Sequence, residues 1–360
     1  MGKYRPFNNS NQAEGLVSEV FEHPNDPNVR LIGTPTSGIW KLNNSTNSWE
    51  NVTDNLGLPA MGVNEIIVNP FDDNQLFASS GNYAIGSKYG LGILVSNDKG
   101  SNWNVMPGYF YDHFTELMKI IIDENDNDPS DGLTMYVISR KEIFKTTNTG
   151  ASWTQLTNPN SNMGSLEFFD IITNNNGRIF VSTGGQNSTC FSSDDGGISW
   201  NDISAQFGVF GALRFSSNVE TSTLYCCFDP GGSIRKIAKS TDNGLNWSIL
   251  PFQTTKGDGA NSLVIEHSSL TGFIYLDLGN PGLKRYDDNG VVFNINSGHV
   301  DSRDIQFIPS TNGFDKLLRA NDGGVEKTVK LTHFSRFIVI HPCRFKLTHV
   351  SRFKVTHLAA

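Results

Sequence analysis

The chain has 360 residues, of which 37% are hydrophobic and 18% charged, so it is long enough to bury a large core. Its formal net charge of −8 argues against nucleic acid and anionic membranes as main partners, because both are negatively charged. No stretch approaches the roughly 18 consecutive apolar residues of a membrane span. The first residues, Met1 to Gln12, are polar and contain no apolar core of a secretory signal peptide. We therefore expect either a cytoplasmic protein or a chain whose true start is missing.

Short strands are predicted from the N-terminal end onward, after an extension of residues 1–16. In the first unit, strands are expected at Glu19–Phe21, Arg30–Gly33 and Gly38–Lys41, with a turn at Pro24–Asn28. In the second unit, they are expected at Asn64–Val68, Leu76–Ser79, Gly92–Val95 and Asn104–Met106. Short apolar runs separated by turn residues, without a helical period, indicate an all-β protein.

A motif recurs before the last strand of these units, with the pattern Ser/Thr-x-Asp/Asn-x-Gly-x-x-Trp, and we call it the box. Four copies are complete: Ser96, Asp98, Gly100 and Trp103; Thr146, Asn148, Gly150 and Trp153; Ser193, Asp195, Gly197 and Trp200; Ser240, Asp242, Gly244 and Trp247. Their Trp residues are 50, 47 and 47 positions apart. Two worn copies extend the series, one with Asn44 and Trp49 and the other with Asp288, Gly290 and Phe293.

The box residues are interpreted as a structural hairpin turn rather than an active site. The Asp and Ser or Thr side chains accept backbone N–H groups inside a turn, and Gly adopts the left-handed conformation. The Trp begins the next strand and packs an apolar face beneath the hairpin.

A repeat of four strands at this period predicts an all-β fold, a β-propeller of about seven four-stranded blades. A seventh unit starts at Asp304 and reaches Thr328, where the serine of a box is expected, but no box follows. We therefore place the propeller at 17–328 with an incomplete last blade. Closure then depends on a strand from the N-terminal residues or from the tail.

The tail, residues 329–360, contains an eight-residue repeat: Ser335–Pro342, Cys343–Val350 and Ser351–Leu358. It has four of the eight His residues and no acidic residue. One hypothesis is a basic module that binds metal or anions. The favoured one is an aberrant or disordered segment of translated tandem repeats, although its alternating apolar residues suit a strand that pairs with the open seventh blade.

On these motifs the chain resembles the BNR/Asp-box propeller superfamily. That group includes sialidases, xyloglucanase-type glycoside hydrolases, sortilin-type receptor ectodomains and photosystem II assembly factors. Large secreted bacterial proteins of the glycosyl hydrolase-like or sortilin N-terminal-like type are especially similar, in the phrases at Gly33–Lys41, Gly90–Trp103 and Asn321–Thr328. The resemblance implies the fold more strongly than any function.

The catalytic phrases of the enzymatic relatives are not found. The resemblance implies a catalytic Asp in a Thr-Asp-x-Gly-Gly phrase of the first blade, where this chain has Thr34-Pro35-Thr36-Ser37-Gly38. The Arg-Ile-Pro segment of sialidases is also absent, since Tyr4-Arg5-Pro6 lacks the Ile. The second propeller that forms the cleft of xyloglucanases is missing as well, and a glycosidase usually needs two carboxylates that flank the sugar bond.

Two polar clusters are candidate sites. His299, Asp301 and Arg303 alternate along one predicted inner strand, and Asp322 belongs to the same blade. They are candidate ligand-binding residues, with Asp301, Asp304 and Asp322 as candidate catalytic carboxylates, although a salt bridge of Asp301 with Arg303 at the channel mouth is the favoured explanation. The carboxylates Asp123, Asp126, Asp128 and Asp131 are a weak Ca²⁺ candidate, because they lack the order of an EF-hand and suit a solvated turn. No cofactor is predicted.

Three functional hypotheses follow. The first is a non-catalytic binding or scaffold module of an extracellular or cell-surface bacterial protein, with a glycan or protein ligand. The second is a glycoside hydrolase of the Asp-box class, which needs a facing carboxylate pair. The third is an assembly factor, which needs a charged or apolar patch on one propeller face.

Overall fold

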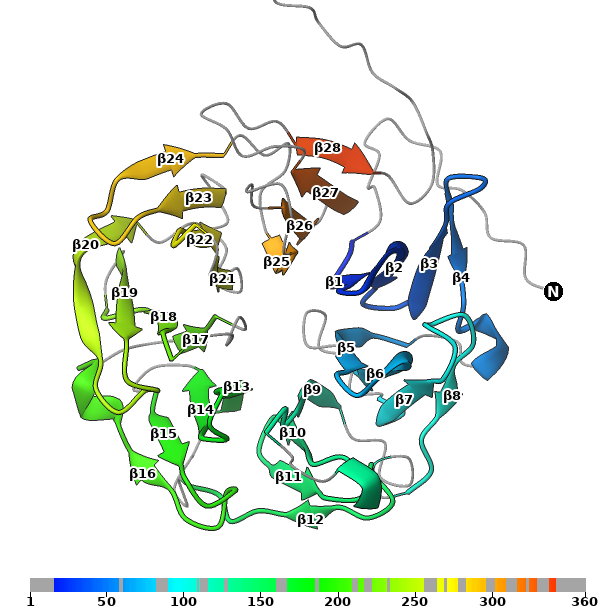
Figure 1. The fold of residues 1–360 in the computed structure, drawn as a ribbon, viewed down its shortest axis with the longest axis horizontal. Helices are drawn as coiled ribbons and strands as arrows, with labels where there is room; N and C mark the ends of the chain where they lie inside the picture. Colours follow the sequence, from blue (N-terminus) through cyan, green and yellow to red (C-terminus); the bar gives the residue numbers. More distant parts are fainter. Residues whose placement is uncertain are drawn as a thin grey trace, which may run out of the picture.

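The protein is a ring of seven four-stranded antiparallel sheets around a central axis (Figure 1). The structure is a computed structural model, which describes residues 16–57, 61–81, 90–108, 110, 116–125, 129–159, 167–184, 188–208, 213–216, 222–231, 234–255, 264–268, 271–277, 283–295, 302–308, 316–321, 324–328 and 337–340. The predicted all-β propeller is confirmed. Within this part of the chain, no helix is long and apolar enough to cross a membrane.

In each blade the strands run in chain order from the channel outward. Blade one has β1 (Glu19–His23), β2 (Asp26–Gly33), β3 (Ile39–Asn43) and β4 (Ser48–Asn51), and blade two has β5 (Val63–Asn69), β6 (Asp72–Ser80), β7 (Ile93–Ser96) and β8 (Asn104–Val105). Blade three has β9 (Leu117–Ile122), β10 (Met135–Ser139), β11 (Ile143–Thr146) and β12 (Thr154–Gln155), and blade four has β13 (Glu167–Thr173), β14 (Ile179–Gly184), β15 (Cys190–Ser193) and β16 (Asn201–Asp202). Blade five has β17 (Leu213–Phe215), β18 (Leu224–Phe228), β19 (Ile234–Ser240) and β20 (Ser248–Thr255), and blade six has β21 (Val264–His267), β22 (Ile274–Asp277), β23 (Leu283–Tyr286) and β24 (Val292–Asn294). Blade seven has β25 (Ser302–Ile308), β26 (Lys316–Asn321), β27 (Gly324–Thr328) and β28 (Phe337–Ile340). Three short 3₁₀ helices are described besides, at Asp54–Leu56, Pro129–Asp131 and Ser204–Gln206.

The four complete boxes form the same turn between the third and fourth strands of blades two to five. In each, the Ser or Thr hydroxyl donates to the Asp or Asn side chain at 2.8 Å. The same hydroxyl accepts the N–H of the box glycine at 2.8–3.1 Å. The box glycines have φ angles between 75° and 87°, a left-handed conformation that other residues rarely adopt.

Each box glycine also lies against the preceding blade. A Cβ added to Gly100 would lie 2.7 Å from Leu31, and one added to Gly244 would overlap the ring of Phe180. The box therefore sets the turn and lets neighbouring blades approach closely.

In the worn copies, the turn acceptor lies one residue earlier than the motif alignment predicts. Asn43 Oδ1 accepts the N–H groups of Ser45 and Thr46, whereas the Asn44 side chain donates to the carbonyl of Asn28. In blade six, Asp287 Oδ1 accepts N–H groups within the turn, at 2.8 and 3.0 Å. Asp288 instead forms an ion pair with Lys239 of blade five. The assignment of Asn44 and Asp288 to the box role is therefore wrong.

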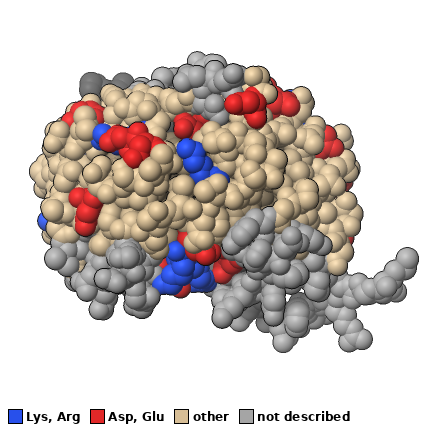
Figure 2. All heavy atoms as spheres, turned by 90° about the horizontal axis from the view of Figure 1, so that it is seen from below, with Lys and Arg blue, Asp and Glu red and all other residues tan. Residues whose placement is uncertain are grey.

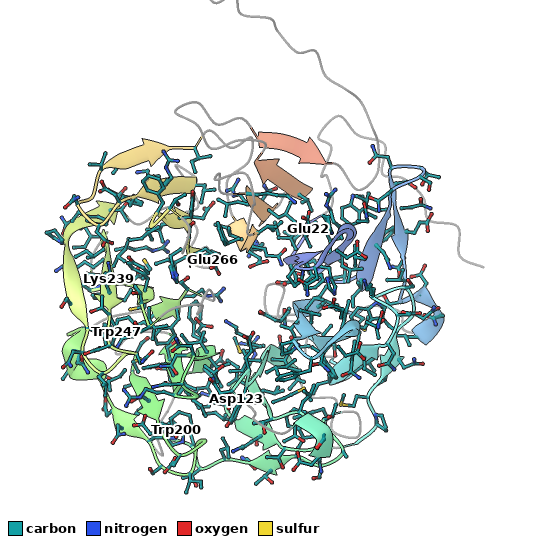
Figure 3. All side chains as sticks on the ribbon, in the orientation of Figure 1. Glu22, Asp123, Trp200, Lys239, Trp247 and Glu266 are labelled. Atoms are coloured by element: carbon teal, nitrogen blue, oxygen red, sulfur yellow. The ribbon has the colours of Figure 1, made fainter. Side chains whose placement is uncertain are left out.

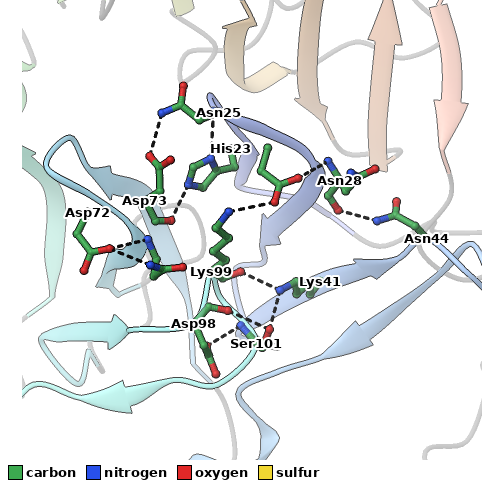
Figure 4. A network of polar contacts seen from close by, with 12 residues as sticks. His23, Asn25, Asn28, Lys41, Asn44, Asp72, Asp73, Asp98, Lys99 and Ser101 are labelled. Atoms are coloured by element: carbon green, nitrogen blue, oxygen red, sulfur yellow. Dashed lines mark hydrogen bonds and ion pairs between the residues drawn. The ribbon is translucent and has the colours of Figure 1, made fainter.

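Polar contacts join the turns of adjacent blades around the first interface (Figure 4). Lys99, in the box of blade two, pairs with Asp26 of blade one at 3.1 Å. Lys41, on β3, donates at 2.8 Å to the carbonyl of Lys99 and at 2.7 Å to Ser101. His23 contacts the carbonyl of Asp73 at 2.8 Å. These bonds link blade one to the box of blade two.

The core is divided among the interfaces between blades. Seven apolar clusters are described, and each contains residues from a different pair of adjacent blades. Trp247, for example, packs against Phe180, Phe207 and Phe215 between blades four and five. Cys226 and Cys227 belong to the clusters on opposite sides of blade five, as expected of neighbours on a strand.

Blade seven takes its outer strand from the tail. Its own repeat supplies β25, β26 and β27, and β28 from the first octapeptide pairs antiparallel with β27. The blade meets blade one through apolar residues that include Val20, Trp49 and Leu318. The Glu22 backbone N–H donates to Gln306 at 2.6 Å across the same interface, and Lys316 pairs with the Glu22 carboxylate. The ring is therefore closed between its last and first blades.

Candidate functional site

The inner strands carry charged side chains into the central channel, although their other residues are mostly apolar. Six of these residues line its narrow part, and we call them the channel ring: Glu19 on β1, Glu65 on β5, Lys119 on β9, Arg214 on β17, Glu266 on β21 and Asp304 on β25. Blade four contributes Asp170, which is fully buried and pairs with Lys119 at 2.8 Å. Figure 3 places Glu266 at the edge of the central opening.

Three of the channel carboxylates bond to the inner strand of the next blade. Asp170 accepts the backbone N–H of Phe215 at 2.7 Å. Asp304 accepts that of Val20 at 3.2 Å, and Glu19 accepts that of Ile66 at 3.4 Å. Inner strands of neighbouring blades do not pair as a sheet, so these carboxylates satisfy N–H groups that face the next blade. Asp170, Asp304 and Glu19 thus hold adjacent blades together.

The carboxyl groups of blades seven, one and two share one region of the channel and resist ionisation. Burial, with the charges of Asp304 and Glu65, raises the pKa of Glu19 well above its usual range, and Glu19 and Asp304 hydrogen-bond to each other. Burial also raises the pKa of Asp304. Burial raises the pKa of Glu65 to about 7, although the charge of Lys119 opposes this rise; the charges of Asp304 and Asp170 add to it.

The cationic side of the ring keeps its charge. Although burial lowers the pKa of Lys119, the carboxylates of Asp170 and Glu65 raise it above its ordinary value. Arg214 lies over the ring of Phe169, with its guanidinium carbon 4.8 Å from the ring centroid. The channel therefore holds positive charge beside carboxyl groups whose pKa values are raised, that of Glu65 to about 7.

Two cavities that share lining residues lie along the channel. The narrower one, of about 120 Å³, is lined by the channel ring together with Arg303. The wider one, of about 620 Å³, shares Glu19, Glu65, Lys119 and Asp304 as its base. Its walls combine aliphatic and polar side chains: Ile66, Ile121, Ile305, Glu124, Asn125 and Asn174. The wider cavity has the volume of a small-ligand pocket, whereas the narrower one does not.

The predicted site residues are only partly within the described structure. Arg303 and Asp304, both on β25, line the narrower cavity. His299, Asp301 and Asp322 lie outside the described residues. The first-blade phrase forms a turn in which Thr34 donates to the carbonyl of Gly38 at 2.9 Å.

The acidic turn of blade three is also described in part. Asp123 accepts the backbone N–H of Asn125 at 3.0 Å, and Asp131 belongs to a 3₁₀ helix. Asp126 and Asp128 lie outside the described residues. Within the part of the chain that is described, no group of three or more His, Cys, Asp or Glu side chains could hold a metal ion.

A Ser-His-Glu cluster between blades five and six was not anticipated from the sequence. Ser216 Oγ lies 2.8 Å from His267 Nδ1 and 3.2 Å from Glu266. Burial, with the charge of Lys239, lowers the pKa of His267 to about 4. The Glu266 carboxylate accepts a hydrogen bond from the serine itself, and Ser216 is only 1% exposed. Because a nucleophilic serine needs a base held by the acid and access to substrate, we interpret the cluster as a structural contact.

The sequence did contain a signal for the channel ring. Each inner strand is an apolar segment interrupted by a charged residue, such as Glu65 in VNEIIVN and Lys119 in LMKIII. Because at least one charged residue recurs in the inner strand of every unit, the pattern indicates charged side chains that gather around the axis of the repeat.

The chain is similar to several known proteins in sequence or in fold. No family model matches the chain. A xyloglucanase of Hypocrea jecorina (strain QM6a) is 30% identical over 95 residues, which are 25% of this chain and 11% of that protein. A probable oligoxyloglucan-reducing end-specific xyloglucanase of Neosartorya fischeri is 23% identical over 148 residues, which are 40% of this chain and 18% of that protein. The chain thus matches less than a fifth of the length of these curated relatives.

Solved structures resemble the chain over most of its length. The GH74 xyloglucanase from Xanthomonas campestris superposes with a TM-score of 0.66 at 17% identity, over 91% of this chain and 55% of that one. YCF48 from Cyanidioschyzon merolae gives a TM-score of 0.58 at 12% identity, over 88% of this chain and 96% of that one. The fold is a seven-bladed β-propeller. At these identities, the likeness to solved structures extends no further than the fold.

Proposed function

We propose that the protein is a non-catalytic binding module that holds its ligand in the wider cavity of the channel. One observation carries this proposal: Glu19, Asp170 and Asp304 bond to the inner strands of neighbouring blades, while the cavity beside them provides about 620 Å³. Carboxylates that serve as structural acceptors are not available to attack or protonate a substrate. The resemblance of the box repeats to those of secreted proteins supports a location outside the cell or at its surface.

The walls of this cavity favour a ligand with both apolar surface and hydrogen-bonding groups. Isoleucines provide the apolar part, and Glu124, Asn125 and Asn175 are among the polar residues of the lining. A glycan and an extended peptide segment both meet that requirement. Among the similar proteins, two are named as xyloglucanases, and a further solved structure is that of YCF48 bound to D1 peptide.

A basic nucleic-acid surface is not evident on the side of the ring shown in Figure 2. Acidic and basic side chains of the described residues are scattered there among uncharged ones. This side does not present the clustered positive charge that nucleic acid requires.

The test is calorimetric titration with xyloglucan oligosaccharides and, separately, with extended peptides. Asn175 is exposed and lines the wider cavity, so Asn175→Trp should fill part of it and weaken binding at least tenfold. Asn176→Trp is the matched control, because Asn176 is also exposed but does not line the cavity. Equal binding by both variants would place the ligand elsewhere.

A glycoside hydrolase is the second candidate, supported by the sequence matches to xyloglucanases. Its carboxylate pair would include Asp301, Asp304 or Asp322. The described pair, Glu19 and Asp304, is in hydrogen-bond contact and therefore closer than the roughly 5–10 Å between the two carboxyl groups of a glycosidase.

An assembly role is the third candidate, supported by exposed aliphatic residues. Ile198, Leu245 and Val291, which follow the glycine of the boxes of blades four, five and six, are 78%, 55% and 51% exposed. If this row binds a protein, Leu245→Asp should abolish protein binding without changing glycan binding.

A further inference from the structure

The outer strand of blade seven differs in origin from those of the other blades. In blades one to six it directly follows a box or a worn box, whereas β28 is reached through residues 329–336. It pairs with β27 in four positions: Val325 with Ile340, Glu326 with Val339, Lys327 with Ile338, and Thr328 with Phe337. Because these contacts are backbone hydrogen bonds of a β-ladder, they depend little on which side chains the added strand carries.

Two further segments of this chain have the pattern of β28. Phe337 and Val339 are matched eight residues later by Phe345 and Leu347, and again by Phe353 and Val355. The positions of Ile338 and Ile340 are matched by Lys346 and Thr348, and by Lys354 and Thr356. Side chains alternate between the two faces of a strand, so all three segments have one face with an aromatic and an aliphatic residue.

The polar face of the second and third segments suits an outer strand of this propeller. The residues of β12 and β16, the outer strands of blades three and four, are all exposed and polar: Thr154, Gln155, Asn201 and Asp202. On β4, Ser48 and Glu50 are exposed while Trp49 between them is buried. An apolar face and a polar face are therefore the normal pattern at this position.

We propose that the three octapeptide segments of this chain are alternative outer strands of blade seven, which occupy in turn one strand-binding site along β27. The connection from Thr328 roughly doubles in length for the second segment and triples for the third. The entropy of loop closure depends only logarithmically on length, so occupancy should fall about threefold for the second segment and about fivefold for the third. The site is thus the outer edge of β27, and it accepts extended segments of this chain that have one apolar face.

The test is disulfide trapping in the full chain, with Cys343→Ser as background. Glu326→Cys is combined in turn with Val339→Cys, Leu347→Cys and Val355→Cys, which are equivalent positions of the three segments. Residues directly opposite in an antiparallel ladder have Cα atoms about 4.5–5.5 Å apart, within the reach of a disulfide. Glu326→Cys with Lys346→Cys is the control, because Lys346 belongs to the other face of its segment.

After equilibration in a glutathione buffer, mass spectrometry should find the intramolecular disulfide in all three test pairs. The Leu347→Cys pair should reach about a third of the yield of the Val339→Cys pair, and the control should stay near the background. A disulfide in the Val339→Cys pair alone would overturn the proposal, because β28 would then be the exclusive outer strand. Disulfide-linked dimers would also overturn it, since the strand would come from a second copy.

A second measurement does not depend on cysteine chemistry. Val339→Pro removes a backbone donor from β28, yet the melting temperature should change little because the second segment replaces the first. The triple variant Val339→Pro, Leu347→Pro and Val355→Pro should lower it clearly. Equal losses in the single and triple variants would contradict the exchange.

Discussion

Glu65→Gln should make the propeller more stable at pH 8 and leave its stability nearly unchanged at pH 5. Glu65 belongs to the carboxyl cluster formed by blades seven, one and two, and its pKa is raised from 4.5 to about 7. The native state therefore binds more protons than the unfolded state between these values. The stabilisation linked to this group is complete below about pH 4.5 and is lost as the pH rises through about 7.

The size of this stabilisation follows from the difference between the two pKa values of Glu65, 4.5 and about 7. Each pH unit between the two pKa values corresponds to about 1.4 kcal/mol, so the upper bound for Glu65 is about 3 kcal/mol. Glu65 is only partly buried, so its charge is partly screened by solvent. We therefore expect the free energy of unfolding of Glu65→Gln to be about 1–2 kcal/mol higher than that of the wild type at pH 8.

The assay is urea unfolding of both proteins at half-unit intervals from pH 5 to pH 8, followed by tryptophan fluorescence. The difference between variant and wild type isolates Glu65 from the other titrating groups. Glu50→Gln, an exposed substitution of the same type on β4, is the control and should show no pH-dependent difference. A Glu65→Gln difference that stays constant with pH, or a wild type that is the more stable at pH 8, would refute the reasoning.

Further predictions concern single positions, each measured by urea unfolding. Gly244→Ala should lower the free energy of unfolding by roughly 2–4 kcal/mol, because φ is 76° and the new methyl group overlaps Phe180. Gly231→Ala is the control: φ is 107° and no atom lies within 4 Å of the added Cβ, so the loss should be only about 1 kcal/mol. Equal losses in the two variants would contradict the packing account. Asp170→Asn should destabilise by roughly 2–4 kcal/mol because Lys119 is left without its ion-pair partner, and a loss under 0.5 kcal/mol would show that the pair is not needed. Asn243→Gly should raise the free energy of unfolding by about 0.5–1 kcal/mol, because Asn243 has a φ of 58° and blade four has Gly196 at the same box position. The side-chain oxygen of Asn243 is also buried without a hydrogen-bond partner among the described residues. A lower free energy of unfolding in the variant would refute this prediction.

The blades could be predicted from the sequence because each box combines a left-handed glycine with local side-chain bonds. Those requirements depend on residues within eight positions of each other, so Ser96, Asp98 and Gly100 identify a turn by themselves. Where two acceptors are adjacent, as at Asn43 and Asn44 or Asp287 and Asp288, the motif cannot distinguish the turn acceptor. The contacts that determine which of the two residues bonds within the turn, such as the ion pair of Lys239 with Asp288, come from the neighbouring blade.

The channel was harder to predict, because its residues are far apart in the chain. Alternation within one strand, which predicts the His299 cluster, is a local pattern, whereas the channel ring takes one residue from each of six blades. The bond from Val20 to Asp304 spans 284 positions, and it exists only when the ring closes. The octapeptides share no motif with the boxes, so only their alternating apolar residues indicated the fourth strand of blade seven.

The central claim is that the propeller binds without hydrolysing, and reducing-sugar release tests it most directly. Folded protein would be incubated with xyloglucan, other β-glucans and sialosides, and new reducing ends would be measured over time. The account predicts no release above that of a heat-inactivated sample. Release that is abolished by Asp301→Asn or Asp322→Asn would contradict it and identify a glycoside hydrolase.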